Sequence, residues 1–153
     1  MLYIEYDSKG EIMKLFAKIF IVILIAGFIG IQFIKVDRKN PTVKADLRAP
    51  REVKNILKES CYDCHSNETK WPWYSYVAPF SLLIEKDVKE GRRELNFSEW
   101  ETYDSQKKAF LKKEIWEEIE NDEMPKSVYT LTRPNAKLDF VKKNIIKKWA
   151  VGY

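Results

Sequence analysis

Residues 61–65 read Cys-Tyr-Asp-Cys-His, and they decide how the chain is interpreted because they contain both cysteines and the only histidine among 153 residues. The segment just before them has a helical pattern, in which Val53, Ile56 and Leu57 share one face. No β-branched strand pattern leads into the motif. We therefore expect a helix that runs straight into the Cys-x-x-Cys-His segment.

The chemistry of this motif requires three residue types at fixed offsets. It is the attachment signature of c-type haem, in which two thiols bond to the porphyrin vinyl groups and the adjacent imidazole ligates the iron. The pattern predicts one covalent haem c per chain, attached through Cys61 and Cys64, with His65 as the proximal iron ligand. Two cysteines and one histidine are one ligand short of a closed structural zinc site.

Two other interpretations of the cysteine pair stay open. In a thiol–disulfide oxidoreductase the first cysteine, Cys61, would attack a substrate disulfide. A thioredoxin-like fold needs alternating strands and helices, and the segment before Cys61 is helical in pattern. The third interpretation is a structural disulfide between Cys61 and Cys64 beside an incidental histidine.

The second axial ligand is predicted by elimination. His65 is the only histidine, so methionine, lysine or an open site remain. Met1 and Met13 lie at or before an apolar N-terminal segment, which leaves Met124, in the polar stretch 121–126, as the candidate distal ligand. The alternative role for Met124 is to fill a gap in the core.

Aromatic and basic residues between these ligands have two interpretations each. Residues 70–80 contain five aromatics and two prolines, so they form a rigid loop that either walls the haem edge or belongs to the core. Arg92 and Arg93 either pair with haem propionates or belong to a solvated charged face.

Residues 15–34 form an apolar stretch that is interrupted only by Lys18 and Gln32 near its ends. About 20 helical residues span roughly 30 Å, which is enough to cross a bilayer. The stretch is longer than the apolar part of a signal peptide and lacks a good cleavage site, so we expect an uncleaved transmembrane signal anchor.

The anchor divides the chain into four parts. Residues 1–14 are a short cytoplasmic N-terminus, of which 1–12 are acidic and suggest that Met13 is the true start. Residues 35–49 are polar and proline-containing and are expected to form a linker. Residues 50–153 are the c-type haem-binding domain.

Four helical patterns in this domain predict an all-α fold. After the helix before Cys61, they cover 81–90 with Gly91 at the end, 104–120, and a last helix from Asp139. The net charge of +4 comes from well-mixed acids and bases, so no nucleic-acid partner is expected. No paired carboxylates, phosphate loop or nucleophile elbow supports an enzyme.

Most of residues 50–150 resemble the haem-binding domain family of small membrane-anchored bacterial proteins. The resemblance lies in Cys61 to Asn67, Trp71 to Ser75, Glu90 to Arg92, Leu95 to Ser98, Glu123 to Pro125, and Ala136 with Leu138. It implies a fold like class I cytochrome c, in which the first and last helices pack together and a methionine loop closes the pocket. Relatives often have histidine where this chain has Asp87 and Arg133, which leaves Met124 or an open iron here.

Covalent haem attachment to Cys-x-x-Cys-His takes place outside the cytoplasm, so the domain is expected on the periplasmic side of the inner membrane. The expected function is electron transfer through iron with a transient redox protein partner, not enzymatic catalysis. One alternative is a haem-based sensor or peroxidase-like protein with an open or labile sixth site. The other is a membrane-anchored thiol–disulfide oxidoreductase.

Overall fold

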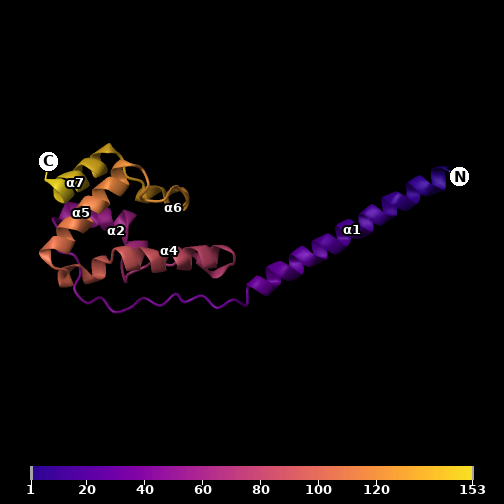
Figure 1. The fold of residues 1–153 in the computed structure, drawn as a ribbon, viewed down its shortest axis with the longest axis horizontal. Helices are drawn as coiled ribbons and strands as arrows, with labels where there is room; N and C mark the ends of the chain where they lie inside the picture. Colours follow the sequence, from indigo (N-terminus) through magenta and orange to yellow (C-terminus); the bar gives the residue numbers. More distant parts are fainter. Residues whose placement is uncertain (1, 153) are drawn as a thin grey trace.

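A long helix, α1 (Leu2–Ile31), projects from a bundle of shorter helices in the computed structural model (Figure 1). The structure describes the backbone of residues 2–152 and the side chains of residues 9–152. Within these residues the secondary structure is entirely helical, which confirms the predicted all-α class. The part of α1 from Lys9 to Ile31, 23 residues, is long and apolar enough to cross a membrane. The helix ends three residues before the predicted boundary at Ile34, because residues 32–34 form a turn.

The four helices expected after the anchor are all present, and two short ones add to them. They are α2 (Arg51–Ser60), α3 (Tyr62–His65), α4 (Phe80–Glu94), α5 (Ser105–Glu120), α6 (Ser127–Thr132) and α7 (Phe140–Val151). Three 3-10 turns join them: η1 (Trp73–Tyr76), η2 (Phe97–Thr102) and η3 (Pro134–Ala136). At four and six residues, α3 and α6 are too short for an apolar periodicity to show in the sequence.

The core lies where α2, α5, α7 and η2 meet. α7 packs on both α5 and α2, so the first and last helices of the bundle are in contact. Phe97 of η2 is fully buried and stacks on Tyr62 with ring centroids 5.0 Å apart. Trp149 of α7 is partly buried and packs against Trp100, with 6.0 Å between the ring centroids. Burial of these large aromatics supplies much of the stabilisation.

Side-chain caps fix where α5 and α7 begin. Asp104 accepts a hydrogen bond from Lys107 N at the start of α5, and Asp139 does the same for Lys142 N at the start of α7. The predicted cap at Asp139 is therefore confirmed. Such caps typically stabilise a helix by about 1 kcal/mol.

The predicted helix end at Gly91 is wrong, because α4 continues to Glu94. Gly91 lies inside the helix, where glycine usually costs stability. A Cβ atom at this position would lie 2.6 Å from the carbonyl oxygen of Cys64, closer than atoms can approach. Glycine is needed here for the close contact between α4 and α3, not for a turn.

The segment 35–49, expected as a linker, is extended and lies along the domain surface (Figure 1). It is attached by hydrogen bonds from one end to the other. Asp37 N donates to Glu85, Asn40 donates to the Thr69 carbonyl, Leu47 N donates to the Phe97 carbonyl, and Arg48 N donates to Glu101. Because these hydrogen bonds occur along the whole segment, it forms part of the domain surface. This attachment restricts how far the domain can move from α1.

Candidate functional site

The Cys-x-x-Cys-His motif forms the short helix α3, directly after α2. Cys61 begins α3, and its carbonyl oxygen accepts hydrogen bonds from Cys64 N at 3.2 Å and His65 N at 2.9 Å. Residues three and four positions apart share one face of a helix, so the spacing from the N-cap residue Cys61 to Cys64 and His65 favours one common side for the two thiols and the imidazole. All three side chains are half-buried, and both cysteines are free thiols. This is the arrangement that covalent attachment and ligation from one side require.

The His65 ring is oriented by main-chain carbonyls. Its Nδ1 atom lies 3.0 Å from the carbonyl oxygen of Gly91 and 3.2 Å from that of Leu95. Both partners are acceptors, so Nδ1 carries the proton and Nε2 keeps its lone pair. Burial lowers the pKa of His65, which also favours the neutral ring. A metal-binding histidine is commonly oriented by such a bond from its other nitrogen, and iron ligation by Nε2 stays a prediction.

The two thiols lie in an environment that keeps them protonated. Burial, with a further contribution from Cys64, raises the pKa of Cys61 to about 12. Burial, with the nearby carboxylates of Asp87 and Asp63, raises the pKa of Cys64 to about 11. Catalytic thiols of disulfide oxidoreductases have a lowered pKa and an electropositive setting. The surroundings of this motif are therefore the reverse of what the oxidoreductase interpretation needs.

Asp63, inside the motif, connects α3 to α6. Its buried carboxylate accepts hydrogen bonds from Tyr129 Oη at 2.9 Å and Lys70 N at 2.9 Å, and it pairs with Arg133 at 3.1 Å. Arg133 also donates to the Lys70 carbonyl at 2.7 Å. Arg133 therefore holds the segment after Met124 against the motif by an ion pair.

A buried polar network joins two of the motifs that the sequence analysis singled out. Asn67 N donates to Ser98 Oγ at 2.9 Å, and Asn96 Nδ2 donates to Asn67 Oδ1 at 2.9 Å. Asn67 and Ser98 are almost completely buried, so these hydrogen bonds hold the two segments firmly in place. Together they fix the exit from α3 against η2.

Arg92 is bound by protein groups, and its pairing with a haem propionate stays a prediction. Its guanidinium donates to the carbonyl oxygens of Ser66 and Lys39 and to the side chains of Asn40 and Thr69. It therefore clamps segment 35–49 to the end of α3 and is engaged with protein groups. Arg93 is exposed and pairs with Glu94 at 2.8 Å, which agrees with a solvated face.

Met124 lies half-buried in the loop between α5 and α6. Its backbone N donates to the Glu118 carbonyl at 3.1 Å, so the loop folds back on the end of α5. Two residues later, Lys126 pairs with Asp87 of α4 at 2.7 Å. This ion pair ties the methionine loop to the helix that packs on Cys64. Ligation by Met124 stays a prediction.

Apolar side chains beside the motif are left uncovered. Phe80 and Ile84 lie on the same face of α4 as Gly91, and Phe80 is 55% exposed. On α6, Val128 and Leu131 are 73% and 80% exposed. The Lys126–Asp87 ion pair joins the N-cap of α6 to α4, so these exposed apolar residues lie on two linked helices. Exposed apolar side chains of this kind suit an apolar ligand such as a porphyrin.

One polar atom in the aromatic loop also lacks a partner. Trp71 Nε1 is buried and forms no hydrogen bond within the described part of the chain. Indole N–H groups normally find an acceptor when buried. A haem propionate is an acceptor of the right kind, so this atom supports the pocket interpretation of residues 70–80.

Comparison with known proteins identifies the class of this site. The model of the haem-binding domain family matches residues 26–151. The chain therefore belongs to the haem-binding domain family, and the resemblance inferred from the motifs is confirmed. Neither a curated protein nor a solved structure matches the chain. The closer relationship to class I cytochrome c stays a prediction.

Sequence reasoning missed the groups that orient the motif. The carbonyl acceptors of His65 at Gly91 and Leu95 carry no side-chain signal. Asp63 connects α3 to α6 through Tyr129, which lies 66 residues later in the sequence, so no local pattern reveals this role. The glycine between Glu90 and Arg92 was a usable signal, because an unexplained glycine inside a helical pattern often marks a close backbone approach.

Proposed function

We propose that this chain is a membrane-anchored c-type haem protein that transfers electrons through one haem, attached covalently to Cys61 and Cys64. The haem-binding domain supports a haem cofactor. When bound, haem supplies a one-electron iron couple. The chain's own residues hold the group, set its axial ligands and restrict access of water.

The orientation of His65 is the observation that carries the proposal. The carbonyls of Gly91 and Leu95 fix the proton on Nδ1, so Nε2 is available as proximal ligand on the same face as both thiols. A histidine oriented in this way needs no rearrangement when iron binds. The close approach of Gly91 to the Cys64 backbone keeps α4 next to the His65 ring.

For the distal side we propose Met124. It is half-buried, and the loop that carries it is tied to α4 by the Lys126–Asp87 ion pair. A methionine ligand opposite histidine raises the reduction potential, which suits an electron carrier. No catalytic side chain is required for this function. A redox protein would bind transiently at the haem edge.

A second candidate is a haem-based sensor or peroxidase-like protein with an open or labile sixth site. The observation in its favour is that Asp87 and Arg133, where relatives often have histidine, are engaged in ion pairs with Lys126 and Asp63. Neither position then offers iron a ligand. Carbon monoxide binding by the reduced wild-type protein would favour this candidate over the electron carrier.

The proposed location is the inner membrane, with α1 as a single span and residues 50–153 in the periplasm. The 23-residue apolar helix supports anchoring. The orientation follows from the site of covalent haem attachment. The short N-terminus would then lie in the cytoplasm.

Haem staining on a denaturing gel tests the proposal directly. The full chain is expressed in a host with an active periplasmic c-type maturation system, beside a Cys61→Ala, Cys64→Ala double variant. Glu68→Ala, at an exposed position three residues after the motif, is the matched control. We expect stain at the mass of the chain for wild type and control, and none for the double variant. If the wild-type chain stays unstained while another cytochrome in the same host is matured, covalent haem attachment is refuted. The thiol–disulfide interpretation of Cys61 and Cys64 is then favoured.

A further inference from the structure

The end of α1 is clamped to the aromatic loop by a pair of hydrogen bonds. Gln32, the first residue after α1, donates from Nε2 to the Ala78 carbonyl at 3.2 Å, and its Oε1 accepts from Ala78 N at 3.0 Å. The same amide donates to the Phe28 carbonyl within α1 at 3.0 Å. A single side chain, that of Gln32, therefore connects the end of α1 to the loop that precedes α4.

A second set of contacts fixes η1 to the chain just after α1. Arg38 Nε donates to the Ser75 carbonyl at 2.8 Å, and its guanidinium lies 4.4 Å from the centre of the Tyr76 ring. Asp37 N donates to Glu85 of α4 at 2.9 Å. In Figure 1 the beginning of α4 is accordingly the part of the bundle beside the end of α1. The bundle has a defined position relative to α1.

This position sets the height of η1 relative to a bilayer. The apolar helix of 23 residues is about 35 Å long, and the hydrocarbon core is about 30 Å thick. Gln32 then lies at the membrane surface, at the boundary of the hydrocarbon. The headgroup layer on each side is roughly 5–8 Å thick. Contacts from Gln32 and Arg38 therefore place η1 within or directly against this layer.

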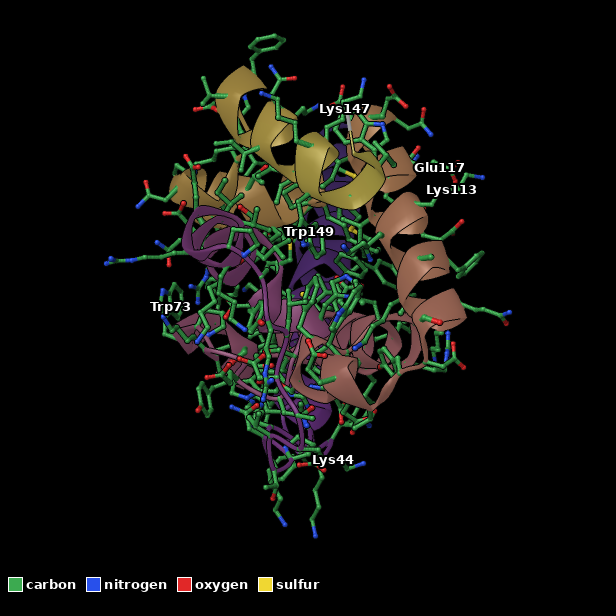
Figure 2. All side chains as sticks on the ribbon, turned by 90° about the vertical axis from the view of Figure 1, so that its left-hand side faces the viewer. Lys44, Trp73, Lys113, Glu117, Lys147 and Trp149 are labelled. Carbon is green, nitrogen blue, oxygen red and sulfur yellow. The ribbon has the colours of Figure 1, made fainter. Side chains whose placement is uncertain are left out.

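The side chains at this height suit a lipid interface. Trp73 is 79% exposed and Tyr76 is 62% exposed, and Phe33, next to Gln32, is 80% exposed. We call these three residues the interfacial patch. Trp73 lies at the edge of the molecule in Figure 2, whereas Trp149 is partly buried against the core. Trp and Tyr are enriched where membranes meet water, because their rings are apolar and their N–H or O–H groups are polar.

We propose that the interfacial patch binds the headgroup boundary of the bilayer that α1 crosses, and so holds the haem domain against the membrane in one orientation. This inference rests on the membrane anchoring in the proposed function. It explains why exposed aromatics lie next to the clamp at Gln32. It also means that the haem is presented to partners at a fixed height above the membrane.

Hydroxyl-radical footprinting of the haem-loaded full chain in phosphatidylcholine and phosphatidylglycerol nanodiscs tests the inference. The oxidation rate of each side chain is divided by its rate in the unfolded chain, which removes intrinsic reactivity. Phe140 is the internal control, because it is 79% exposed like Trp73 and belongs to α7, the helix that lies far from α1 in Figure 1. We expect several-fold protection of Trp73 and Tyr76, and little protection of Phe140.

A variant of the clamp gives an independent measurement. Gln32→Ala removes both hydrogen bonds to Ala78 and should raise the normalised labelling of Trp73 and Tyr76, with haem staining unchanged. Gln106→Ala, at an exposed position on α5, is the matched control and should leave labelling unchanged.

Three outcomes would overturn the inference. Equal normalised labelling of Trp73 and Phe140, with residues 15–31 protected, would refute the patch and leave the anchor intact. Labelling of residues 15–31 would refute the anchor itself, whereas haem staining would still report on the haem site. Protection of Trp73 in native membranes but not in nanodiscs would assign the patch to a protein partner.

Discussion

His65 Nδ1 and the carbonyl oxygen of Gly91 lie 3.0 Å apart, at the point where α4 passes closest to α3. The same glycine leaves no room for a Cβ, which would lie 2.6 Å from the Cys64 carbonyl oxygen. One position of α4 therefore both orients the histidine and supports the backbone between the second cysteine and the histidine. The spacing of the two helices and the geometry of the site depend on each other.

Gly91→Ala should destabilise the domain and reduce haem loading. The new Cβ would meet main-chain atoms of Cys64, which cannot rotate away, so α4 must shift. Overpacking of this kind costs roughly 1–3 kcal/mol, against about 1 kcal/mol that alanine gains over glycine inside a helix. The free energy of unfolding, from urea titration in detergent, and haem stain per chain measure the two effects.

The control for this variant is Gly27→Ala, because a Cβ at Gly27 would have no heavy atom within 4 Å outside its own helix backbone. We expect it to be neutral or slightly stabilising. Equal stability and equal haem loading of the two variants would show that the close contact at Gly91 has no structural importance.

The helices of this fold could be predicted from the sequence because their signals are local. The stripe Leu111, Ile115 and Ile119 in α5 is buried, and the cap at Asp139 forms as expected. Gly91 was misplaced because glycine has the same sequence signature at a helix end and at a close helix contact. Segment 35–49 reads as a linker because its attachment uses backbone N–H and C=O groups, which no residue type reveals.

The candidate site was predictable only where chemistry fixes the spacing. Cys61, Cys64 and His65 follow from one local motif, and the structure places Cys61 at the N-cap of α3 and the other two within this helix. The partners of Asp63 and Asp87 come from the distant segment 126–133, so their pairing depends on the tertiary fold. Local patterns carry no information of that kind.

Arg133→Ala should destabilise the protein by about 1–3 kcal/mol, because it leaves the buried Asp63 carboxylate without its cationic partner. Asp63 keeps its bonds from Tyr129 and Lys70, which limits the loss. Urea unfolding measures the effect. Arg93→Ala removes an arginine whose ion pair is exposed, and it should change stability by less than about 0.5 kcal/mol. Equal effects of the two variants would contradict a structural role for the Asp63 pair.

The contacts at the two ends of segment 35–49 should weaken in acid. Hydrogen bonds from Lys89 and the Asp37 N–H lower the pKa of Glu85, and those from Lys108 and the Arg48 N–H lower the pKa of Glu101. A lowered folded-state pKa gives stability that is present above the unfolded value, about 4.3, and is lost as pH falls through the folded value. The protection factors of the Asp37 and Arg48 amides, which are the exchange rates normalised to the intrinsic rate at each pH, should therefore fall below about pH 4.

The matched test of this acid response uses the Glu85→Gln, Glu101→Gln double variant. Both amides keep an acceptor oxygen for the backbone N–H groups but lose the titration. We expect the protection factors of the Asp37 and Arg48 amides to be somewhat lower in the double variant at pH 7 and much less dependent on pH. If the protection factors of the wild type and of the double variant depended on pH in the same way, Glu85 and Glu101 would be excluded as the cause of that dependence.

Met124→Ala tests the proposed distal ligand. If the thioether sulfur ligates iron, the oxidised variant loses a sulfur-to-iron charge-transfer band, the reduced variant binds carbon monoxide readily, and the reduction potential falls. Met13→Ala, in α1 and 70% exposed, is the matched control and should leave the spectrum unchanged. Haem staining should persist in both variants, because Cys61 and Cys64 are intact. A Met124→Ala spectrum identical to that of wild type would exclude Met124 and leave Lys126 or an open site.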